Sequence, residues 1–306
     1  MSETANDVLL RCLPQVRRAR LHRFYLGNGD RILDLWQDGG RGVLGARHAG
    51  LGVSVKALLD RGLDRALPSI HDARLERALE ARWPGAVAFR IYRNEDRALV
   101  SLARVIGADP VSLSLSGFLG GDPVRDPARE LHAAGHPGQE EVTPASTGEA
   151  SARPVGSAGL LRPFAQWVDG LPEPFPAVAV ALLPLPRGSG PGVLAFGSTS
   201  AAALAWPSDL VPPLMADSAA KALYALARLE ASADEASWER FDRACHHLFR
   251  RRGPWLFMKV PPERHTAFFE AALARGVLVS PDPALPCLVP LDFDHGELAG
   301  LKDLVP

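Results

Sequence analysis

The spacing of apolar residues changes in the middle of residues 86–106. Residues 86–92 alternate between apolar and polar as a half-buried strand does, and Ala98, Leu102 and Ile106 then recur at helical spacing. Asn94 is a favourable N-cap residue for the helix. The pattern predicts a strand, a tight turn and a helix, which is where α/β folds commonly hold a phosphate group.

The residues of this turn do not favour an anion. The turn reads Arg93-Asn94-Glu95-Asp96, without a glycine that would allow close approach of a ligand. Glu95 and Asp96 fall in the first helical turn, where carboxylates stabilise the helix dipole and repel a phosphate. The shape therefore predicts a phosphate site, and the charges argue against one.

Earlier positions predict small elements. We expect an amphipathic helix near residues 6–13 and a β-hairpin over 20–36, whose turn is Gly27-Asn28-Gly29-Asp30. Residues 39–52 are glycine-rich and predict a loop, and helical patterns follow at 53–63 and 72–82.

The middle of the chain predicts a strand at 111–115 and then a change in composition. Residues 122–163 are rich in Pro, Gly, Ala, Glu and Ser, and predict a long mobile loop or partly disordered insertion. The apolar runs 175–183 and 192–197 suit strands buried on both faces, as in a parallel sheet. Residues 217–229 predict a helix.

The C-terminal part alternates helices with strands. Helices are expected at 238–251 and 264–275, a strand at 254–260, strand segments at 276–290 and a short helix at 295–304. Strands that alternate with helices place the chain in the α/β or α+β class.

Composition excludes several classes of protein. With 306 residues, 47% of them hydrophobic, and a net charge of -1, the chain favours neither nucleic acid nor an anionic membrane as a partner. The cysteines Cys12, Cys245 and Cys287 are few and widely spaced, which predicts reduced thiols in a cytoplasmic protein. No stretch has the apolar length of a membrane span.

Residues able to do chemistry are scarce. Lysine occurs only at positions 56, 221, 259 and 302, so any lysine-dependent reaction has four candidates. His132 and His136 would share a helix face and could ligate a metal, but no third ligand follows at a characteristic spacing. A solvated loop is the favoured interpretation there, and no metal site is predicted.

The order of the elements resembles the fold type I pyridoxal phosphate enzymes, specifically class III aminotransferases and glutamate-1-semialdehyde aminomutases. Residues 26–63 resemble the N-terminal block of that family, 82–121 its phosphate-binding strand-turn-helix, and 251–301 its C-terminal small domain. The resemblance implies a reduced large domain with a mainly parallel sheet, and an α+β small domain built from the N- and C-terminal segments. It divides the chain into 1–71 (N-terminal segment), 72–215 (large domain) and 216–306 (small domain).

The departures from the family fall on the groups that bind its cofactor. Arg93, Asn94 and Glu95 stand where the family has its phosphate-binding Ser-Gly-Ser/Thr turn, and Phe118 matches the aromatic residue that stacks on the pyridine ring. The family also has an Asp at the end of a buried strand. Strand 192–196 is followed by Gly-Ser-Thr-Ser, and no Schiff-base lysine occurs between residues 196 and 214. Lys221 is the remaining candidate lysine, in the middle of a predicted helix.

The resemblance thus implies a degenerate, non-catalytic protein with an interaction or regulatory role and no cofactor. A homodimer, or a heterodimer with an active aminotransferase, is the expected assembly. One alternative is a pyridoxal phosphate-dependent aminotransferase or aminomutase that uses Lys221. Another is small-molecule binding in the remaining cleft through acid or base groups at Glu95, Asp96, His48 or Asp209.

Overall fold

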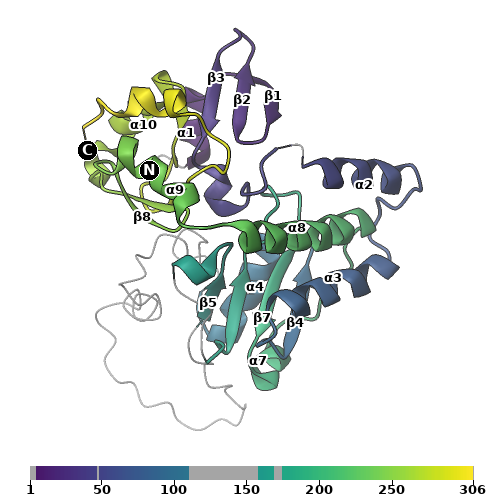
Figure 1. The fold of residues 1–306 in the computed structure, drawn as a ribbon. Coiled ribbons are helices and arrows are strands. Elements are labelled where there is room, and N and C mark those ends of the chain that lie inside the picture. Colours follow the sequence, from purple (N-terminus) through teal and green to yellow (C-terminus); the bar gives the residue numbers. More distant parts are fainter. Residues whose placement is uncertain (1–4, 47, 110–157, 169–173, 306) are drawn as a thin grey trace, which may run out of the picture.

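The computed structural model describes residues 5–46, 48–109, 158–168 and 174–305. Their strands form three sheets, two in the half of the molecule that holds both described ends of the chain and one in the other half (Figure 1). The long helix α8 (Pro213–Ser232) runs from one half into the other. The chain thus combines helices and strands in layers, as the sequence predicts.

The first sheet joins the two ends of the chain. Helix α1 (Ala5–Cys12) leads to the antiparallel strands β1 (Val16–Arg20), β2 (Arg23–Leu26) and β3 (Arg31–Asp34). Strand β10 (Val277–Leu278) then pairs with β3 in parallel. The predicted hairpin and N-terminal helix are confirmed, whereas β1 is an additional strand that the sequence did not predict.

The C-terminal part of the chain forms the second sheet and the helices beside it. Strands β8 (Phe249–Arg252), β9 (Trp255–Met258) and β11 (Cys287–Leu288) form a sheet beside α9 (Ala236–Cys245) and α10 (His265–Ala274). The short helices η4 (Pro262–Arg264) and η5 (His295–Leu301) complete this part. The sequence predicted a helix over 238–251, but α9 ends at Cys245. Residues 249–252 instead form β8, which pairs with β9 after a turn at Gly253, whose φ is +52°.

One apolar core holds these N- and C-terminal segments together. Trp238 and Phe241 of α9 pack with Leu33 of β3, Trp255 of β9 and Phe269 of α10. Burying these side chains stabilises the fold by roughly 1.5–3 kcal/mol for each large apolar residue. Residues from both ends of the chain therefore share one core.

The central sheet has the strand order β4-β7-β6-β5. Its strands are β4 (Ala88–Tyr92), β5 (Ala158–Leu161), β6 (Val178–Ala181) and β7 (Gly192–Phe196). β5 and β6 are parallel, and β7 is antiparallel to both β6 and β4. Three of the four described strands therefore run in one direction, and β7 runs in the other.

Helices cover both faces of this sheet, because alternate strand residues point to opposite sides. Val193 and Ala195 face α8 and α3 (Ile70–Arg82), while Leu194 and Phe196 face α4 (Glu95–Ile106) and α7 (Thr199–Leu204). Because helices cover both faces of the sheet, the sequences of its buried strands are continuous apolar runs. Helix α2 (Ala49–Leu59) packs on α8.

Two predicted loops were partly wrong. Residues 158–161, at the end of the predicted loop 122–163, form β5, because pairing with β6 supplies its hydrogen bonds. Residues 122–157 and the predicted strand 111–115 lie outside the described residues. The predicted loop 39–52 contains η1 (Gln37–Gly40) at its start, and α2 begins within it at Ala49.

Cys245 and Cys287 are buried free thiols, and burial raises the pKa of each to about 12, whereas Cys12 is only partly buried. Among the described residues, no helix combines the length and the apolar character needed to cross a membrane. The division of the chain at residues 72 and 216 stays a prediction.

Candidate functional site at the carboxyl ends of the strands

Three strands of the central sheet end at the same edge. β4 and β6 each pair antiparallel with β7, and β5 is parallel to β6, so the carboxyl ends of β4, β5 and β6 meet there. Ligand sites of open α/β sheets lie outside this edge. The start of α4 also lies here, because Gly192, the first residue of β7, packs against the carbonyl of Asn94 with no space for a Cβ.

The start of α4 is formed as the sequence predicts. Asn94 is the N-cap, and its side chain accepts a hydrogen bond of 2.9 Å from the backbone N–H of Arg97. The backbone N–H of Arg93 donates to Asp209 Oδ2 at 3.1 Å. The exposed Arg93 guanidinium lies 3.6 Å from the same carboxylate. The structure thus brings the candidates Arg93, Asn94, Glu95 and Asp209 together.

Glu95 is bound by an arginine that the sequence did not indicate. Arg41 Nε and Nη2 donate to the two oxygens of Glu95, each at 2.7 Å, and Nη1 donates to the carbonyl of Asp38 at 2.9 Å. The Arg41 side chain is 1% exposed and the Glu95 side chain 23% exposed. A bidentate pair of this kind is the strongest geometry for a guanidinium and a carboxylate. The pair lies at the start of α4, because Glu95 is the first residue of that helix.

A strained loop holds Arg41 in this position. Gln37 and Asp38 have positive φ angles of 47° and 49°, followed by Gly39 and Gly40 at 66° and 101°. Asp38 Oδ2 accepts a hydrogen bond of 2.7 Å from the backbone of Arg187, which precedes β7. Positive φ angles at non-glycine residues cluster at sites where the surrounding structure fixes the chain. Here they place Arg41 against α4.

The end of β5 is covered by an arginine and a tryptophan. Arg162 follows β5 directly, is buried, and its guanidinium carbon lies 5.4 Å from the ring centre of Trp255. The indole N–H of Trp255 donates to the carbonyl of Pro163 at 3.0 Å. The same ring packs on Gly40, which leaves no room for a side chain there. The Arg162 and Trp255 side chains and the backbone of Gly40 therefore pack together beside this strand end.

One assignment made from the sequence is wrong because of strand direction. The sequence placed the position of the missing Asp after residues 192–196, but β7 is the antiparallel strand, so its last residues lie at the opposite edge of the sheet. The backbone N–H of Gly197 accordingly donates to Pro176, before the start of β6. Besides β4, the strands that end at the candidate site are β5, followed by Arg162, and β6, followed by Leu182 and Leu183.

Lys221 lies elsewhere, in a polar cluster between three helices. Its Nζ is 2.8 Å from Asp217 Oδ2, one turn earlier on α8, and it also donates to Ser54 of α2. Ser54 in turn donates to Asp217, and His71 Nδ1 of α3 lies 3.0 Å from Asp217 Oδ1. We name Ser54, His71, Asp217 and Lys221 the Asp217 cluster.

The Asp217 cluster is not arranged as a catalytic triad. In a triad the serine contacts the histidine, whereas here serine, histidine and lysine all contact the one carboxylate. Burial acts to raise the pKa of Asp217, but the hydrogen bonds from Lys221 and Ser54 outweigh burial, so the pKa lies below its ordinary value. Lys221 thus contacts the Asp217 carboxylate together with Ser54 and His71.

The other residues considered from the sequence do not join either group. Asp96 is exposed on α4, and His48 precedes α2 with a buried Nδ1 that has no hydrogen-bond partner among the described residues. Lys56, Lys259 and Lys302 are exposed, as the sequence predicts. Phe118, His132 and His136 lie outside the described residues, and within those residues no His, Cys, Asp and Glu side chains group as a metal site.

Comparison with solved structures identifies the fold. An omega-transaminase from Sphaerobacter thermophilus aligns over 95% of this chain and 89% of its own, with a TM-score of 0.57 and 15% identity. The N-acetylornithine aminotransferase of Stenotrophomonas maltophilia K279a aligns over 95% and 94%, with a TM-score of 0.57 and 16% identity. The chain therefore has the fold type I architecture of aminotransferases, and the predicted fold class is confirmed.

Sequence comparison relates the chain to proteins of two other organisms. No family model matches it. A protein of Treponema pallidum (strain Nichols), described as uncharacterized, is 30% identical over 313 residues, which cover 92% of this chain and 91% of that protein. The chain belongs to the same family as this Treponema protein. An uncharacterized protein of Borreliella burgdorferi is 43% identical over a shorter stretch of 58 residues.

Proposed function

We propose that this chain is a non-catalytic cytoplasmic protein that keeps the aminotransferase fold for an interaction or regulatory role. The observation that carries the proposal is the ion pair of the buried Arg41 with the partly buried Glu95 at the start of α4. The helix N-terminus attracts an anion, and the chain supplies that anion from its own first helical turn. Arg41 neutralises it, so an external phosphate would have to displace Glu95.

The described residues do not fit pyridoxal phosphate, the cofactor that the fold implies. A positively charged arginine, Arg162, follows β5 at the place where a carboxylate would hold the pyridine nitrogen protonated. The residues that follow β6 are Leu182 and Leu183, neither of which can form a Schiff base. Lys221 forms an ion pair with Asp217. Loss of groups that act as one unit should abolish the chemistry rather than weaken it.

A cofactor titration tests the proposal directly. Pyridoxal phosphate added to the purified chain should give no protein-dependent aldimine absorbance, and borohydride should fix no cofactor to a lysine. A band that persists in Lys259→Ala but disappears in Lys221→Ala would instead support the alternative of a pyridoxal phosphate-dependent aminotransferase or aminomutase.

A phosphate titration tests the role of Glu95. In Glu95→Ala, Arg41 and the α4 N-terminus are released to bind an anion, so inorganic phosphate should raise the melting temperature of this variant and leave the wild type unchanged. Asp96→Ala is the matched control, because it removes an exposed carboxylate from the same helical turn without releasing Arg41. An equal response of both variants would contradict the assignment of the anion position to Glu95.

A second copy of the chain is the partner we propose. Helix α2 packs on α8, yet its residues Val53 and Leu59 are 74% and 51% exposed, and Ile70 at the start of α3 is 70% exposed. Exposed large apolar side chains are a feature of interaction surfaces, and two-fold homodimers are the commonest soluble assemblies.

The oligomeric state tests this partner. We expect a dimer by sedimentation that Val53→Glu converts to a monomer. Leu10→Glu on α1 is the control, because Leu10 is also exposed and apolar but lies on another helix. A monomeric wild type would contradict the homodimer and favour the heterodimer with an active aminotransferase.

A further inference from the structure

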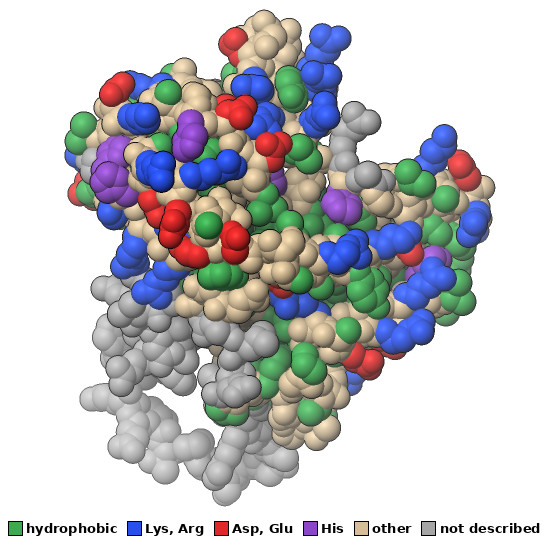
Figure 2. Space-filling view, viewed as in Figure 1, with side chains coloured by type: hydrophobic (Ala, Val, Ile, Leu, Met, Phe, Trp, Pro, Cys, Tyr) green, Lys and Arg blue, Asp and Glu red, His purple; other side chains and the backbone are tan. Residues whose placement is uncertain are grey.

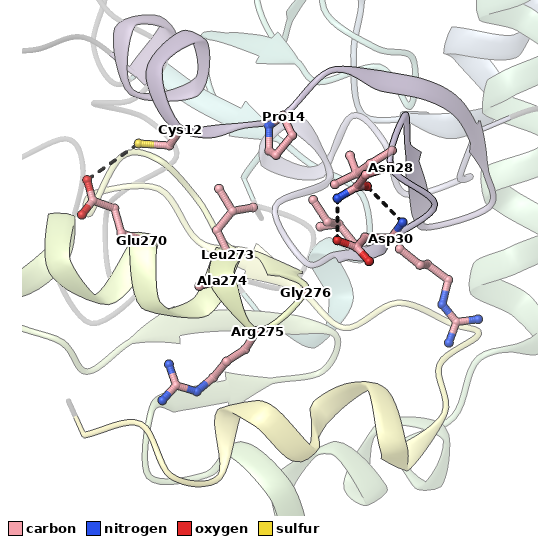
Figure 3. A pocket seen from close by; sticks show the side chains of 12 residues that line it. Cys12, Pro14, Asn28, Asp30, Glu270, Leu273, Ala274, Arg275 and Gly276 are labelled. Carbon is pink, nitrogen blue, oxygen red and sulfur yellow. Dashed lines mark hydrogen bonds between the residues drawn. The ribbon is translucent and has the colours of Figure 1, made fainter.

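A cavity of about 670 Å³ lies in the half of the molecule that holds both ends of the chain, away from the candidate site (Figure 3). Its walls come from the residues after α1, the turn between β2 and β3, and the end of α10. Pockets of 300–1,000 Å³ are the usual size for small-molecule ligands. The volume is therefore sufficient for a compact organic molecule.

The cavity has an apolar base. Leu26 and Ile32 belong to the core of this half of the molecule, and Leu273 and Ala274 line the opposite wall. Pro14 adds a further apolar surface, on the side of α1 in Figure 3. A ligand would therefore need an apolar body, which this base would remove from water.

Two carboxylates border the cavity, and they differ in their partners. Glu270 is bound by Arg11 at 2.6 Å, and Cys12 lies 3.8 Å from the same carboxylate oxygen. Asp30 accepts a hydrogen bond of 2.7 Å from the neutral amide of Asn28. No cation pairs with Asp30 within the described part of the chain. Asp30 is therefore the carboxylate available to a ligand.

The arginines that border the cavity are engaged elsewhere. Arg31 Nη2 lies 3.2 Å from Glu297, and Arg275 Nη1 donates to the carbonyl of Ala271 at 3.1 Å. Figure 3 shows the Arg275 side chain directed away from Asn28 and Asp30. The two arginines that line the cavity thus have partners other than Asp30.

We propose that this cavity binds a small organic amine, with its ammonium group on Asp30 and its apolar body on Leu26, Ile32 and Leu273. An ammonium donates to the Asp30 carboxylate as a charge-assisted hydrogen bond, stronger than the bond from Asn28. The binding step is non-covalent. The site is independent of the proposed loss of catalysis, since it shares no residue with the edge of the central sheet.

Calorimetric titration with three six-carbon probes tests the charge preference. Hexylamine, protonated at neutral pH, should bind, whereas hexanol should bind more weakly and hexanoate should not bind. Binding of hexanoate as tight as that of hexylamine, or no heat with any of the three, would overturn the proposal.

Three variants test the position of the ligand. Asp30→Asn keeps the acceptor for Asn28 and should weaken hexylamine by about tenfold, the loss expected for one charged hydrogen bond. Asp303→Asn, an exposed carboxylate outside the cavity, should leave the affinity unchanged. Ala274→Phe should block hexylamine and hexanol by filling the cavity. Unchanged affinity for hexylamine in both Asp30→Asn and Ala274→Phe would show that the amine binds elsewhere.

Discussion

Two polar networks connect the N-terminal segment to the central sheet and its helices, and they bury opposite charges. In the Arg41–Glu95 pair the cation is in the interior, with 1% of its side chain exposed, and the anion is partly accessible. In the Asp217 cluster the anion is buried at 3% exposure, and its cation Lys221 is 46% exposed. Breaking a buried pair is costly when the partner left behind cannot reach water. The same substitution type should therefore have different effects in the two networks.

Their positions differ as well. The Arg41–Glu95 pair stands where the strands end, the edge at which this fold would bind a ligand, and a strained loop holds it there. The Asp217 cluster lies between α2, α3 and α8, and in Figure 2 the surface over these helices carries many blue basic side chains. One network lies at the ends of the strands, and the other connects α2, which carries the proposed dimer surface, to α3 and α8.

Glu95→Ala should cause the largest loss of stability. It leaves the Arg41 guanidinium buried with only the Asp38 carbonyl as partner, and should lower the free energy of unfolding by about 3 kcal/mol. Urea unfolding at neutral pH measures this change. Asp96→Ala removes a similar helix-start charge, so the difference between the two variants isolates the pair. A loss no larger than that of Asp96→Ala would mean that Arg41 finds another partner or water.

The second effect concerns the loop that carries Arg41. Asp34 accepts a hydrogen bond of 2.8 Å from the backbone of Gln37, and burial raises the pKa of its carboxyl to about 7. The folded state therefore holds a proton that the unfolded chain, with an ordinary pKa near 4, has released. Between pH 4 and 7 the wild type should lose stability as pH rises, by at most about 1.4 kcal/mol per pH unit.

Asp34→Asn tests this, because the amide does not titrate. The variant should become progressively more stable relative to the wild type as pH rises from 5 to 7, and the difference should level off above pH 7. Urea midpoints at several pH values measure the difference. A constant difference across this range would show that Asp34 has an ordinary pKa in the folded protein.

The sequence predicted the residues at the start of α4 but not what binds them. The period change near Arg93 and the N-cap Asn94 are local signals, so the strand, turn and helix of residues 88–106 were predicted. Arg41 is 54 residues away from Glu95 and lies in a glycine-rich stretch without periodicity. Contacts between distant segments leave no periodic pattern, and the Gly39-Gly40 pair before Arg41 was the only local indication of unusual backbone.

Strand direction was likewise hidden from the sequence. An apolar run such as residues 192–196 reads the same in a parallel or an antiparallel strand, so β7 was assigned to the wrong edge. Strand β5 has only four residues, after a stretch of low complexity, and exists through its pairing with β6. The Asp217 cluster draws its members from three helices, which explains why Lys221 was considered without Ser54 or His71.

Asp217→Asn should have a smaller effect than Glu95→Ala. The amide still accepts from Ser54, and the released Lys221 is exposed, so the loss should be about 1.5 kcal/mol at neutral pH. Because the folded pKa of Asp217 is lowered, its stabilisation is present above the unfolded pKa near 4 and disappears as pH falls through the folded pKa. The loss measured at pH 7 should therefore shrink below pH 4. Glu76→Gln, an exposed carboxylate on α3, serves as the control.

Lys221→Ala should have the smallest effect of all, because it removes the exposed partner and leaves the buried one bound. Asp217 keeps Ser54 and His71, so the loss should be about 0.3–0.5 kcal/mol, the range of an exposed pair one helical turn apart. Lys221 also lowers the pKa of Asp217, so the variant should lose stability at a higher pH than the wild type on acidification. Lys259→Ala, which removes a lysine far from the cluster, should not change the pH at which stability is lost on acidification. A loss above about 2 kcal/mol for Lys221→Ala would mean that the cluster depends on its exposed cation, and the contrast with Arg41 would then fail.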